Sequence, residues 1–373
     1  MDLGAEETAS LCEAPVLVTG AGGFVGGHCV RALLDAGVRP RTLVRSSPEG
    51  MRRRYPGADI RTGTIASAGD TFDGVKTVFN FAYDMRADGI RNLRDFDSLL
   101  ANLGRCNVER LVHASSIVVH DGWPNAVLDE TSALREADDP TSYHSAKILI
   151  ERRIREAVSS GALASAVILR PSLVYGPGGW MWTTETVRRL RRGPVLLPEP
   201  PHDHPQDAPF GLCHTVHAED LALAAIRSSL LQTDRTATYI VSDPNPVTWE
   251  EYYSVHAREI GVGAVKRVPF AELQARIPPA PMPGSKTGPS LAARASSVAR
   301  RMVGSATIDA ISNKLRTLRQ EPQREQIPER WLFDLYSATG HLDVSKAARD
   351  LGFAPARSLE QRVRDMADEL RAV

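Results

Sequence analysis

The chain has 373 residues, of which 42% are hydrophobic and 24% are charged, and acidic and basic side chains are equal in number. This is the composition of a globular protein with one or two domains. The formal net charge of zero argues against nucleic acid as the main partner.

Apolar strands alternate with helices along the first half of the chain. The first dozen residues are expected to be loose. Strands are predicted at 15–19, 41–45, 76–82, 110–115, 166–170 and 237–242, and helices at 27–36 and about 93–103. Such alternation predicts a parallel sheet with helices on both faces, and ligands of these sheets bind at the carboxyl ends of the strands.

The pattern loosens from about Gly176, where proline-rich loops begin. We therefore predict an α/β fold with a Rossmann-type doubly wound sheet and a smaller C-terminal substrate-binding lobe. The Rossmann core is expected at 14–175, with its sheet completed by about 212–243. The lobe is expected at 176–211 and 244–373.

Residues 290–320 are rich in alanine and arginine, with Asp309 as the single acid. They predict a helical insertion that packs on the lobe and exposes a basic face to solvent. A weaker alternative is an amphipathic helix that touches a membrane surface or a partner.

The remaining residues predict neither a bound metal nor a membrane span. Four cysteines are scattered without zinc-site spacing: Cys12, Cys29, Cys106 and Cys213. The N-terminus is acidic and lacks an apolar signal region, and no stretch is long and apolar enough to cross a bilayer. We expect a cytoplasmic protein.

Two motifs indicate chemistry. The run Thr19-Gly-Ala-Gly-Gly-Phe-Val-Gly26 lies between a strand and a helix, where backbone N–H groups bind a dinucleotide pyrophosphate. Downstream, Tyr143 and Lys147 are four residues apart, so they share one face of a helix. Together they suggest proton transfer beside a bound nicotinamide.

These motifs resemble the extended short-chain dehydrogenases/reductases of the NAD-dependent epimerase/dehydratase family, and the resemblance runs from Val16 to about Leu359 outside 290–320. The family's Thr-Gly-x-x-Gly-x-x-Gly turn is met by Thr19, Gly20, Gly23 and Gly26. The resemblance implies that cofactor contacts come from Gly20, Gly22, Gly23, Phe24, Val25, Gly26, Arg45, Thr64, Ile65, Phe81, Ala82, Tyr83, Tyr143, Lys147, Pro171 and Ser172.

Arg45 indicates which cofactor is bound. It ends the second strand, where NAD users carry an acid for the adenosine ribose, and its guanidinium suits a 2′-phosphate. We therefore predict NADP, with NAD as the alternative. Thr64 stands where the family usually has an aspartate that meets the adenine, and Ile65 is expected to pack on that ring.

The resemblance also implies the catalytic roles. Tyr143 is the expected acid or base, Lys147 holds the nicotinamide ribose, and Ser116 donates to the substrate oxygen. Positive charge from Lys147 and the oxidised nicotinamide is expected to lower the pKa of Tyr143. Asn92 matches a family asparagine that supports the lysine through water; a surface or capping role is nearly as well supported.

Other residues bear on the substrate. Trp180 and Trp182 suggest either an aromatic substrate wall or ordinary packing of the lobe. His214 and His217 do not suggest a metal site, because Asp220 is expected to cap a helix there.

Three functions stay open. The first is an NADP(H)-dependent oxidoreductase that interconverts ketone and alcohol on a small molecule, with secondary metabolites among the candidates. The second is an NAD(P)-dependent sugar or sugar-nucleotide epimerase. The least favoured is a non-catalytic dinucleotide-sensing protein. Ile117 and Val118 stand where the family's dehydratases have an acidic pair, which argues against dehydration. Cys213 stands where sugar-nucleotide enzymes often have an arginine that binds the diphosphate, which favours the oxidoreductase over the epimerase. A homodimer is left open as an assembly.

Overall fold

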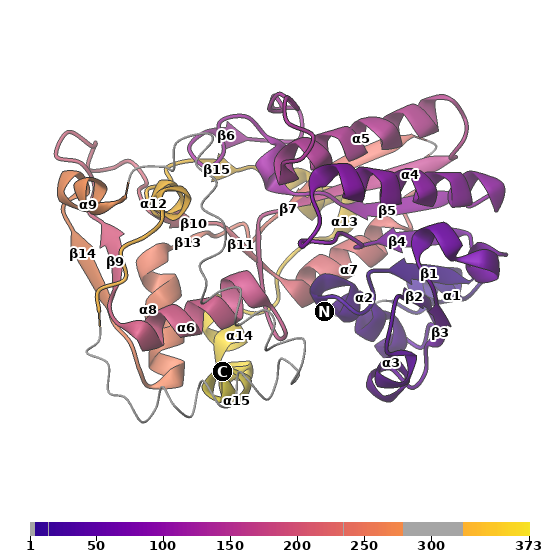
Figure 1. Ribbon diagram of the computed structural model, residues 1–373, viewed down its shortest axis with the longest axis horizontal. Helices are drawn as coiled ribbons and strands as arrows, with labels where there is room; N and C mark the ends of the chain where they lie inside the picture. Colours follow the sequence, from indigo (N-terminus) through magenta and orange to yellow (C-terminus); the bar gives the residue numbers. More distant parts are fainter. Residues whose placement is uncertain (1–3, 14, 234, 279–323) are drawn as a thin grey trace, which may run out of the picture.

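The computed structural model describes residues 4–13, 15–233, 235–278 and 324–373. Its main feature is a sheet of seven parallel strands in the order β12-β7-β5-β4-β1-β2-β3 (Figure 1). The strands are β1 (Val16–Thr19), β2 (Arg41–Val44), β3 (Asp59–Thr62), β4 (Thr77–Asn80), β5 (Arg110–Ala114), β7 (Ser165–Pro171) and β12 (Thr236–Val241).

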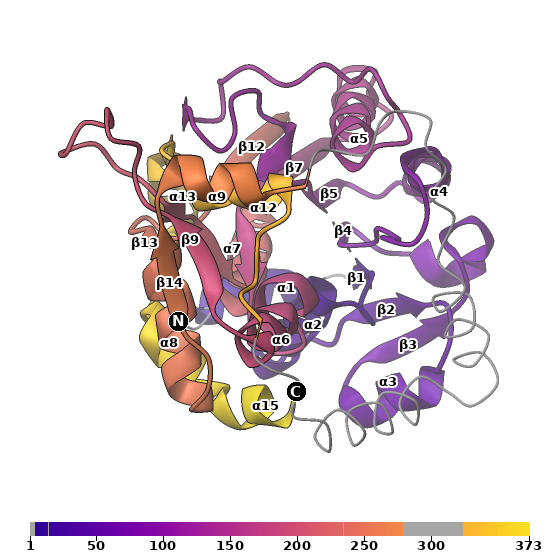
Figure 2. The same cartoon turned by 60° about the vertical axis from the view of Figure 1, so that its left-hand side comes forward.

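Helices cover both faces of this sheet, as Figures 1 and 2 show. The pair α2 (Phe24–Asp35) and α7 (Ala218–Ser228) packs on one face, and the pair α4 (Gly89–Arg105) and α5 (Tyr143–Ser159) packs on the other. Successive strand residues point to opposite faces. Val16 and Val18 therefore join the core under α2 and α7, whereas Leu17 joins the core under α4 and α5.

The predicted fold class is confirmed. From β1 the chain adds β2 and β3 towards one edge, and then β4, β5, β7 and β12 towards the other. The strand order reverses between β1 and β4, so a crevice opens there at the carboxyl ends of the strands.

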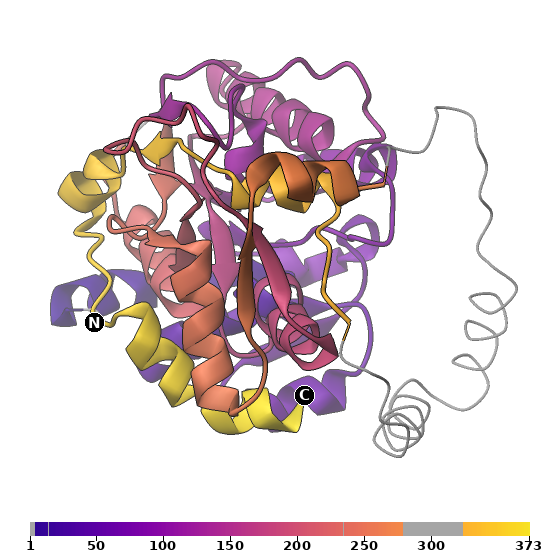
Figure 3. The ribbon, with the colours of Figure 1, turned by 90° about the vertical axis from the view of Figure 1, so that its left-hand side faces the viewer.

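A second, smaller lobe lies beside the sheet in Figure 1 and in front of it in Figure 3. Its core is aromatic, with Trp249, Tyr252, Tyr253 and Tyr336 buried together. The main lobe elements are α6 (Glu185–Arg192), β9 (Val195–Pro198), α8 (Trp249–Ile260), β14 (Val265–Val268), α9 (Phe270–Arg276), α12 (Arg330–Tyr336), α14 (Leu359–Asp365) and α15 (Ala367–Ala372). β9 pairs with β14 in parallel.

Shorter elements connect these parts. They are α1 (Ala5–Cys12), α3 (Pro48–Arg54), η1 (Ile65–Ser67), η2 (Gly69–Phe72), η3 (Ile117–Val119), β6 (Val127–Leu128), β8 (Leu173–Tyr175), a π-helical turn η4 (Trp180–Thr184), β10 (Leu212–Cys213), β11 (Thr215–His217), β13 (Val247–Thr248), β15 (His341–Leu342) and α13 (Ser345–Leu351).

The differences from the sequence prediction include α1 and the edge strand β3. The first residues, expected to be loose, form α1, because Leu11 is buried in the core beside α2 and α7. The edge strand β3 is absent from the prediction because its Asp-Ile-Arg-Thr sequence lacks an apolar run. Its charges are paired instead, since Asp59 bonds Arg41 and Arg61.

None of the helices in the described ranges is long and apolar enough to cross a bilayer. The predicted basic helix at 290–320 lies outside the described residues. The domain boundaries stay a prediction.

Candidate functional site

A cavity of about 640 Å³ opens at the carboxyl ends of β1, β2 and β4. The last residues of these three strands, Thr19, Val44 and Asn80, line it. It therefore lies at the point where the strand order reverses. Its other lining residues include Gly20, Gly22, Gly23, Arg45, Ser46, Ser47, Arg54, Thr64, Ile65, Phe81, Ala82, Tyr83, Asp84, Arg86, Arg91 and Asn92.

The glycine turn forms the floor of this cavity. Gly20 has a φ of +71°, and a Cβ there would lie 2.6 Å from the carbonyl carbon of Phe81. A Cβ on Gly26 would lie 2.3 Å from the carbonyl oxygen of Gly20. Both glycines are therefore needed for the backbone itself to close. Gly22 differs, because a Cβ there would meet only the Met51 sulfur, at 4.0 Å.

Arg45 extends from the end of β2 and is 64% exposed. Its Nη1 donates to Oδ2 of Asp84, 2.8 Å away, in the loop after β4. This bond lowers the pKa of Asp84, so the carboxylate is charged at neutral pH. The pair joins two sides of the cavity, because β2 and β4 flank β1.

Asn92, on α4, organises the Asp84 loop. Its Oδ1 accepts a 2.8 Å bond from the backbone N–H of Asp84, and its Nδ2 donates to the carbonyls of Asp84 and Asp88. Asn92 is buried, and the side chain of Asp88, not Asn92, caps α4. No contact between Asn92 and Lys147 appears among the described residues, so its predicted support of the lysine stays a prediction.

The three strand ends below the cavity are tied together by buried side chains. Thr19 Oγ1 donates to Asn80 Oδ1 at 2.6 Å, and Asn80 Nδ2 lies 2.9 Å from His113 Nδ1. These bonds cross from β1 to β4 to β5. They hold the ends of β1 and β4, which line the cavity, next to the end of β5, which Ser116 follows.

The second group of predicted residues gathers beside the cavity. Tyr143 begins α5 and Lys147 follows one turn later. Lys147 Nζ donates to the carbonyl of Ala114 at 2.7 Å, at the end of β5. The Ser116 side chain acts on the phenol of Tyr143 and lowers its pKa. The structure thus brings the predicted hydroxyl, phenol and ammonium together.

Burial dominates the acid–base properties of this group. The pKa of Tyr143 is raised by desolvation of the phenol, although the residue is 36% exposed, and the influence of Ser116 opposes this shift. The predicted lowering of the Tyr143 pKa relies also on the charge of a bound oxidised nicotinamide, so it stays a prediction. Burial also lowers the pKa of Lys147 to about 8, against the opposing charge of Glu151.

Behind Lys147 lies an ion pair that sequence reasoning missed. Arg170 on β7 donates from Nη2 to Glu151 Oε2 at 2.6 Å and from Nε to Glu151 Oε1 at 3.0 Å. The two side chains are 2% and 1% exposed. Ser115 Oγ also donates to Glu151, at 2.6 Å, and Arg170 Nη1 lies 3.1 Å from His120 Nε2. The sequence did offer a signal for Glu151, because it follows Tyr143 and Lys147 at the same spacing of four residues and so shares their helix face.

The predicted cofactor residues divide into two sets. Nine predicted cofactor residues line the cavity: Gly20, Gly22, Gly23, Arg45, Thr64, Ile65, Phe81, Ala82 and Tyr83. Asn92, which was predicted as a catalytic residue, lines it too. Phe24, Val25 and Gly26 lie outside its lining, in the first turn of α2. Pro171 and Ser172 also lie outside it, and Ser172 Oγ donates to Ser242 Oγ at 2.9 Å. The cavity is also lined by residues that the sequence analysis did not single out, namely Asp84, Arg54, Arg86 and Arg91.

On the lobe side, the two tryptophans have different environments. Trp182 packs against Trp249 and Trp331, with ring centroids 5.5 and 6.1 Å apart, as expected for lobe packing. Trp180 is 56% exposed, and the guanidinium of Arg188 lies 4.5 Å from its ring.

The predicted helix cap at Asp220 is wrong. The side chain of His217 caps α7 by accepting from the backbone N–H of Glu219. Asp220 instead accepts a 2.6 Å bond from Arg362 of α14, which ties the lobe to the sheet domain. Among the described residues, no group of three metal-binding side chains occurs.

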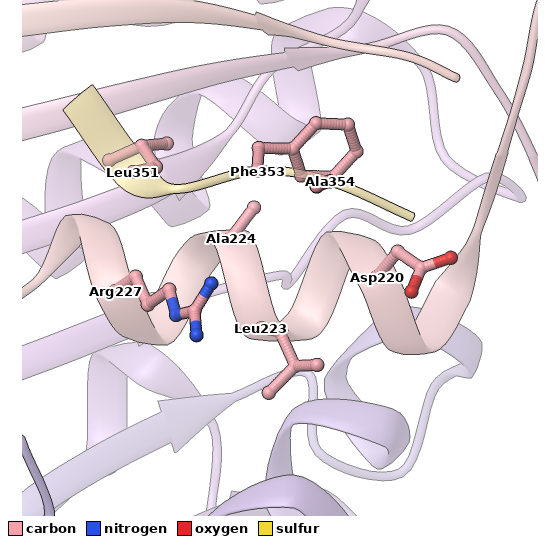
Figure 4. A pocket seen from close by; sticks show the side chains of 7 residues that line it. All are labelled: Asp220, Leu223, Ala224, Arg227, Leu351, Phe353 and Ala354. Carbon is pink, nitrogen blue, oxygen red and sulfur yellow. The ribbon is translucent and has the colours of Figure 1, made fainter. Parts of the chain in front are cut away.

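A second hollow lies between α7 and the segment after α13 (Figure 4). It is too narrow for a water-sized sphere. Both of its charged side chains are engaged, Asp220 by Arg362 and Arg227 by the Gly352 carbonyl, 3.0 Å from its Nη1. We therefore do not consider it a binding site.

Known proteins resemble this chain in sequence. A family model described as the NAD dependent epimerase/dehydratase family matches residues 16–197. A ceramide reductase from Caulobacter vibrioides is 31% identical over 186 residues, which are 48% of this chain and 52% of that protein. A UDP-glucose 4-epimerase from Azospirillum brasilense is 30% identical over 246 residues, which are 58% of this chain and 68% of that protein. The chain spans about half the length of the first curated relatives that it matches.

Solved structures of other proteins have a similar fold. The structure of MoeE5 in complex with UDP-glucose and NAD superposes with a TM-score of 0.63 at 21% identity, over 96% of this chain and 99% of that one. At this identity the likeness concerns the fold alone. The family model and the extent of the match to the Azospirillum epimerase are decisive: this chain belongs to the NAD-dependent epimerase/dehydratase family.

Proposed function

We propose that the protein is an NADP(H)-dependent oxidoreductase that interconverts a ketone and an alcohol on a small molecule. The observation that carries the proposal is the meeting of Tyr143, Ser116 and Lys147 beside the cavity at the switch point of the sheet. Tyr83 connects the two parts, since it lines the cavity and its ring lies 5.1 Å from that of Tyr143. The reductase activity in the name of the Caulobacter relative supports the same reaction class.

The residues of the cavity fit a dinucleotide. At Gly22 the protein leaves room for a Cβ, so its glycine is not needed for packing. A ligand phosphate that approaches this backbone explains why no side chain is present. The turn also leads into α2 through Gly23, and the N-terminus of a helix favours an anion.

The chain's own residues would perform the proton transfer. A bound nicotinamide dinucleotide supplies or accepts the hydride. In the reducing direction, Ser116 donates a hydrogen bond to the substrate carbonyl oxygen, and the proton on Tyr143 Oη moves to that oxygen. The charged Lys147 stabilises the phenolate that remains. In the oxidising direction the same proton returns to Tyr143.

Arginines favour NADP over NAD. Arg45, Arg54, Arg86 and Arg91 line the cavity. A guanidinium has five N–H donors, so the bond between Arg45 and Asp84 leaves capacity for a 2′-phosphate. The cofactor preference rests on this chemistry.

The sugar-nucleotide epimerase is the second candidate, because the Azospirillum epimerase matches the longest share of both chains among the two sequence relatives described above. Cys213 argues against it. This side chain is fully buried in the lobe core, so it does not offer a charge to a diphosphate. A cytoplasmic location and a homodimer stay predictions.

Cofactor stoichiometry tests the proposed function. Incubated with NADPH and a panel of apolar ketones, the protein is expected to oxidise one NADPH for each ketone reduced, measured by absorbance and product analysis. Interconversion of UDP-glucose and UDP-galactose without net NADPH loss would establish the epimerase instead. Tight NADPH binding without turnover on either panel would favour the sensing protein.

Replacing Arg45 by aspartate tests the cofactor preference. A charged hydrogen bond contributes about 1.5–3 kcal/mol, so NADPH affinity is expected to fall about 10- to 100-fold while NADH affinity is kept or rises. Dissociation constants for both cofactors, measured by fluorescence titration, check this result. Arg45→Ala removes the guanidinium without placing a second acid beside Asp84.

Arg53→Asp is the matched control for that charge change. Arg53 is exposed on α3 and does not line the cavity. An equal loss of NADPH affinity in this variant would show a general field effect, and an unchanged preference in Arg45→Asp would remove Arg45 from phosphate recognition.

A further inference from the structure

Tyr83 contacts both residues of the Tyr143–Lys147 pair. It lies in the loop after β4, whereas its two partners lie on α5. Lys147 Nζ is 4.8 Å from the centroid of the Tyr83 ring and 5.8 Å from that of the Tyr143 ring. The Tyr83 and Tyr143 rings meet edge to face, at an interplanar angle of 82°. Lys147 therefore has a closer aromatic partner than the phenol assigned to proton transfer.

The surroundings of Lys147 disfavour its charged form, so an additional stabilising contact is required. The side chain is buried, and its one described hydrogen bond goes to the Ala114 carbonyl. From its own helix it is influenced by Glu151, which favours the charged form, and from β5 by the buried His113, whose pKa is held well below its ordinary value. His113 therefore adds no positive charge near neutral pH. Burial nevertheless lowers the pKa of Lys147 to about 8.

The negative charge of Glu151 stabilises the charged form of Lys147 only in part. Arg170 binds both carboxylate oxygens of Glu151, at 2.6 and 3.0 Å. The positive guanidinium offsets the carboxylate at the position of Lys147. An aromatic face provides additional stabilisation, because the ring quadrupole attracts a cation and this attraction grows when water is excluded.

We propose that Tyr83 is a positioning residue whose ring face keeps Lys147 protonated and aligned beside Tyr143. The proposal rests on the function proposed above, because it assigns a role within that site. Tyr83 acts by packing and not by proton transfer, since its described contacts with Tyr143 and Lys147 are made by its ring.

The hydroxyl of Tyr83 does not contribute a charge to this role. Burial, together with the nearby Tyr143 and Asp88, raises the pKa of Tyr83 to about 12. The phenol is therefore neutral wherever Lys147 titrates. Consequently a phenylalanine, which keeps the ring face, is expected to replace Tyr83 in this role, whereas an aliphatic side chain is not.

The experiment compares Tyr83→Phe with Tyr83→Leu. Reduction needs a charged Lys147, so kcat/KM for the carbonyl falls as pH rises through the Lys147 pKa. A desolvated cation–π contact corresponds to about one pH unit, so the midpoint in Tyr83→Leu is expected about one unit below the wild-type midpoint. Tyr83→Phe is expected to keep the wild-type midpoint, whatever its change in rate.

A second readout separates this proposal from the proposed function. The pH dependence of NADPH binding, followed by fluorescence from about pH 6 to pH 10, reports the charge of Lys147 without turnover. Its midpoint is expected to shift in Tyr83→Leu even if no ketone is reduced. If Tyr83→Leu fails to fold, Tyr83→Met provides the same aliphatic comparison.

Equal midpoints in the wild type, Tyr83→Phe and an aliphatic variant would overturn the proposal while leaving the oxidoreductase function intact. A shifted midpoint in Tyr83→Phe equal to that in Tyr83→Leu would also overturn it, because the hydroxyl would then be the active group. Absence of turnover with a shifted binding midpoint only in the aliphatic variant would contradict the proposed function alone.

Discussion

Tyr143→Phe is expected to lower turnover about 10²- to 10⁴-fold, the range that a positioned acid or base contributes. The variant loses the proton carried on Oη and keeps the ring that meets Tyr83 edge to face at 5.1 Å. Packing and the cofactor cavity are therefore preserved, so the NADPH dissociation constant is expected to stay close to that of the wild type. Steady-state kinetics and fluorescence titration measure the two quantities separately.

A second tyrosine serves as the control for loss of a hydroxyl. Tyr239 lies on β12, and its hydroxyl donates to Asp350 at 3.3 Å, away from the cavity lining. Tyr239→Phe is expected to keep turnover. If Tyr143→Phe also kept turnover, Tyr143 would not be the acid or base, and the proposed mechanism would be wrong.

Glu151→Leu is expected to reduce the free energy of unfolding by about 3–5 kcal/mol. The substitution removes the partner of Arg170, which is 2% exposed and donates two hydrogen bonds to this carboxylate. An unpaired guanidinium would then be left in the core, where desolvation is costly. It also removes the acceptor of Ser115 Oγ at the end of β5. Urea unfolding followed by circular dichroism measures the loss.

The double variant Glu151→Leu/Arg170→Met tests the cause of that loss. With both charges removed, a buried ion pair is replaced by apolar groups, which is often close to neutral in stability. The double variant is therefore expected to be more stable than Glu151→Leu. Glu109→Leu breaks an exposed pair with Lys76 and is expected to change stability little. A double variant as unstable as the single one would show that packing, and not an unpaired charge, causes the loss.

Much of the fold followed from local patterns in the sequence. Short apolar runs ending at Thr19, Val44 and Asn80 alternate with helices, and this alternation alone predicts a parallel sheet. β3 and α1 were missed for a shared reason. The charged β3 is stabilised by pairing with its neighbour strand and by ion pairs, and α1 by the burial of Leu11, and neither contact is local in the sequence.

The candidate site shows the same division. Helical spacing placed Tyr143 beside Lys147, and position after β2 singled out Arg45. The bond of Arg45 to Asp84 spans 39 residues, so no local pattern indicates it. The rise of the Tyr143 pKa in the protein without cofactor was not indicated by the sequence, because it depends on how much water the folded chain removes.

The sequence by itself therefore determined the strand–helix alternation, the glycine turn and the helical pairing of phenol and ammonium, because each depends on residues within a few positions of one another. Only the tertiary structure decided that Tyr83 lies over Lys147 and that Arg170 neutralises Glu151 behind it. Those contacts join separate elements, and their strength comes from burial, a property that an unfolded chain does not have.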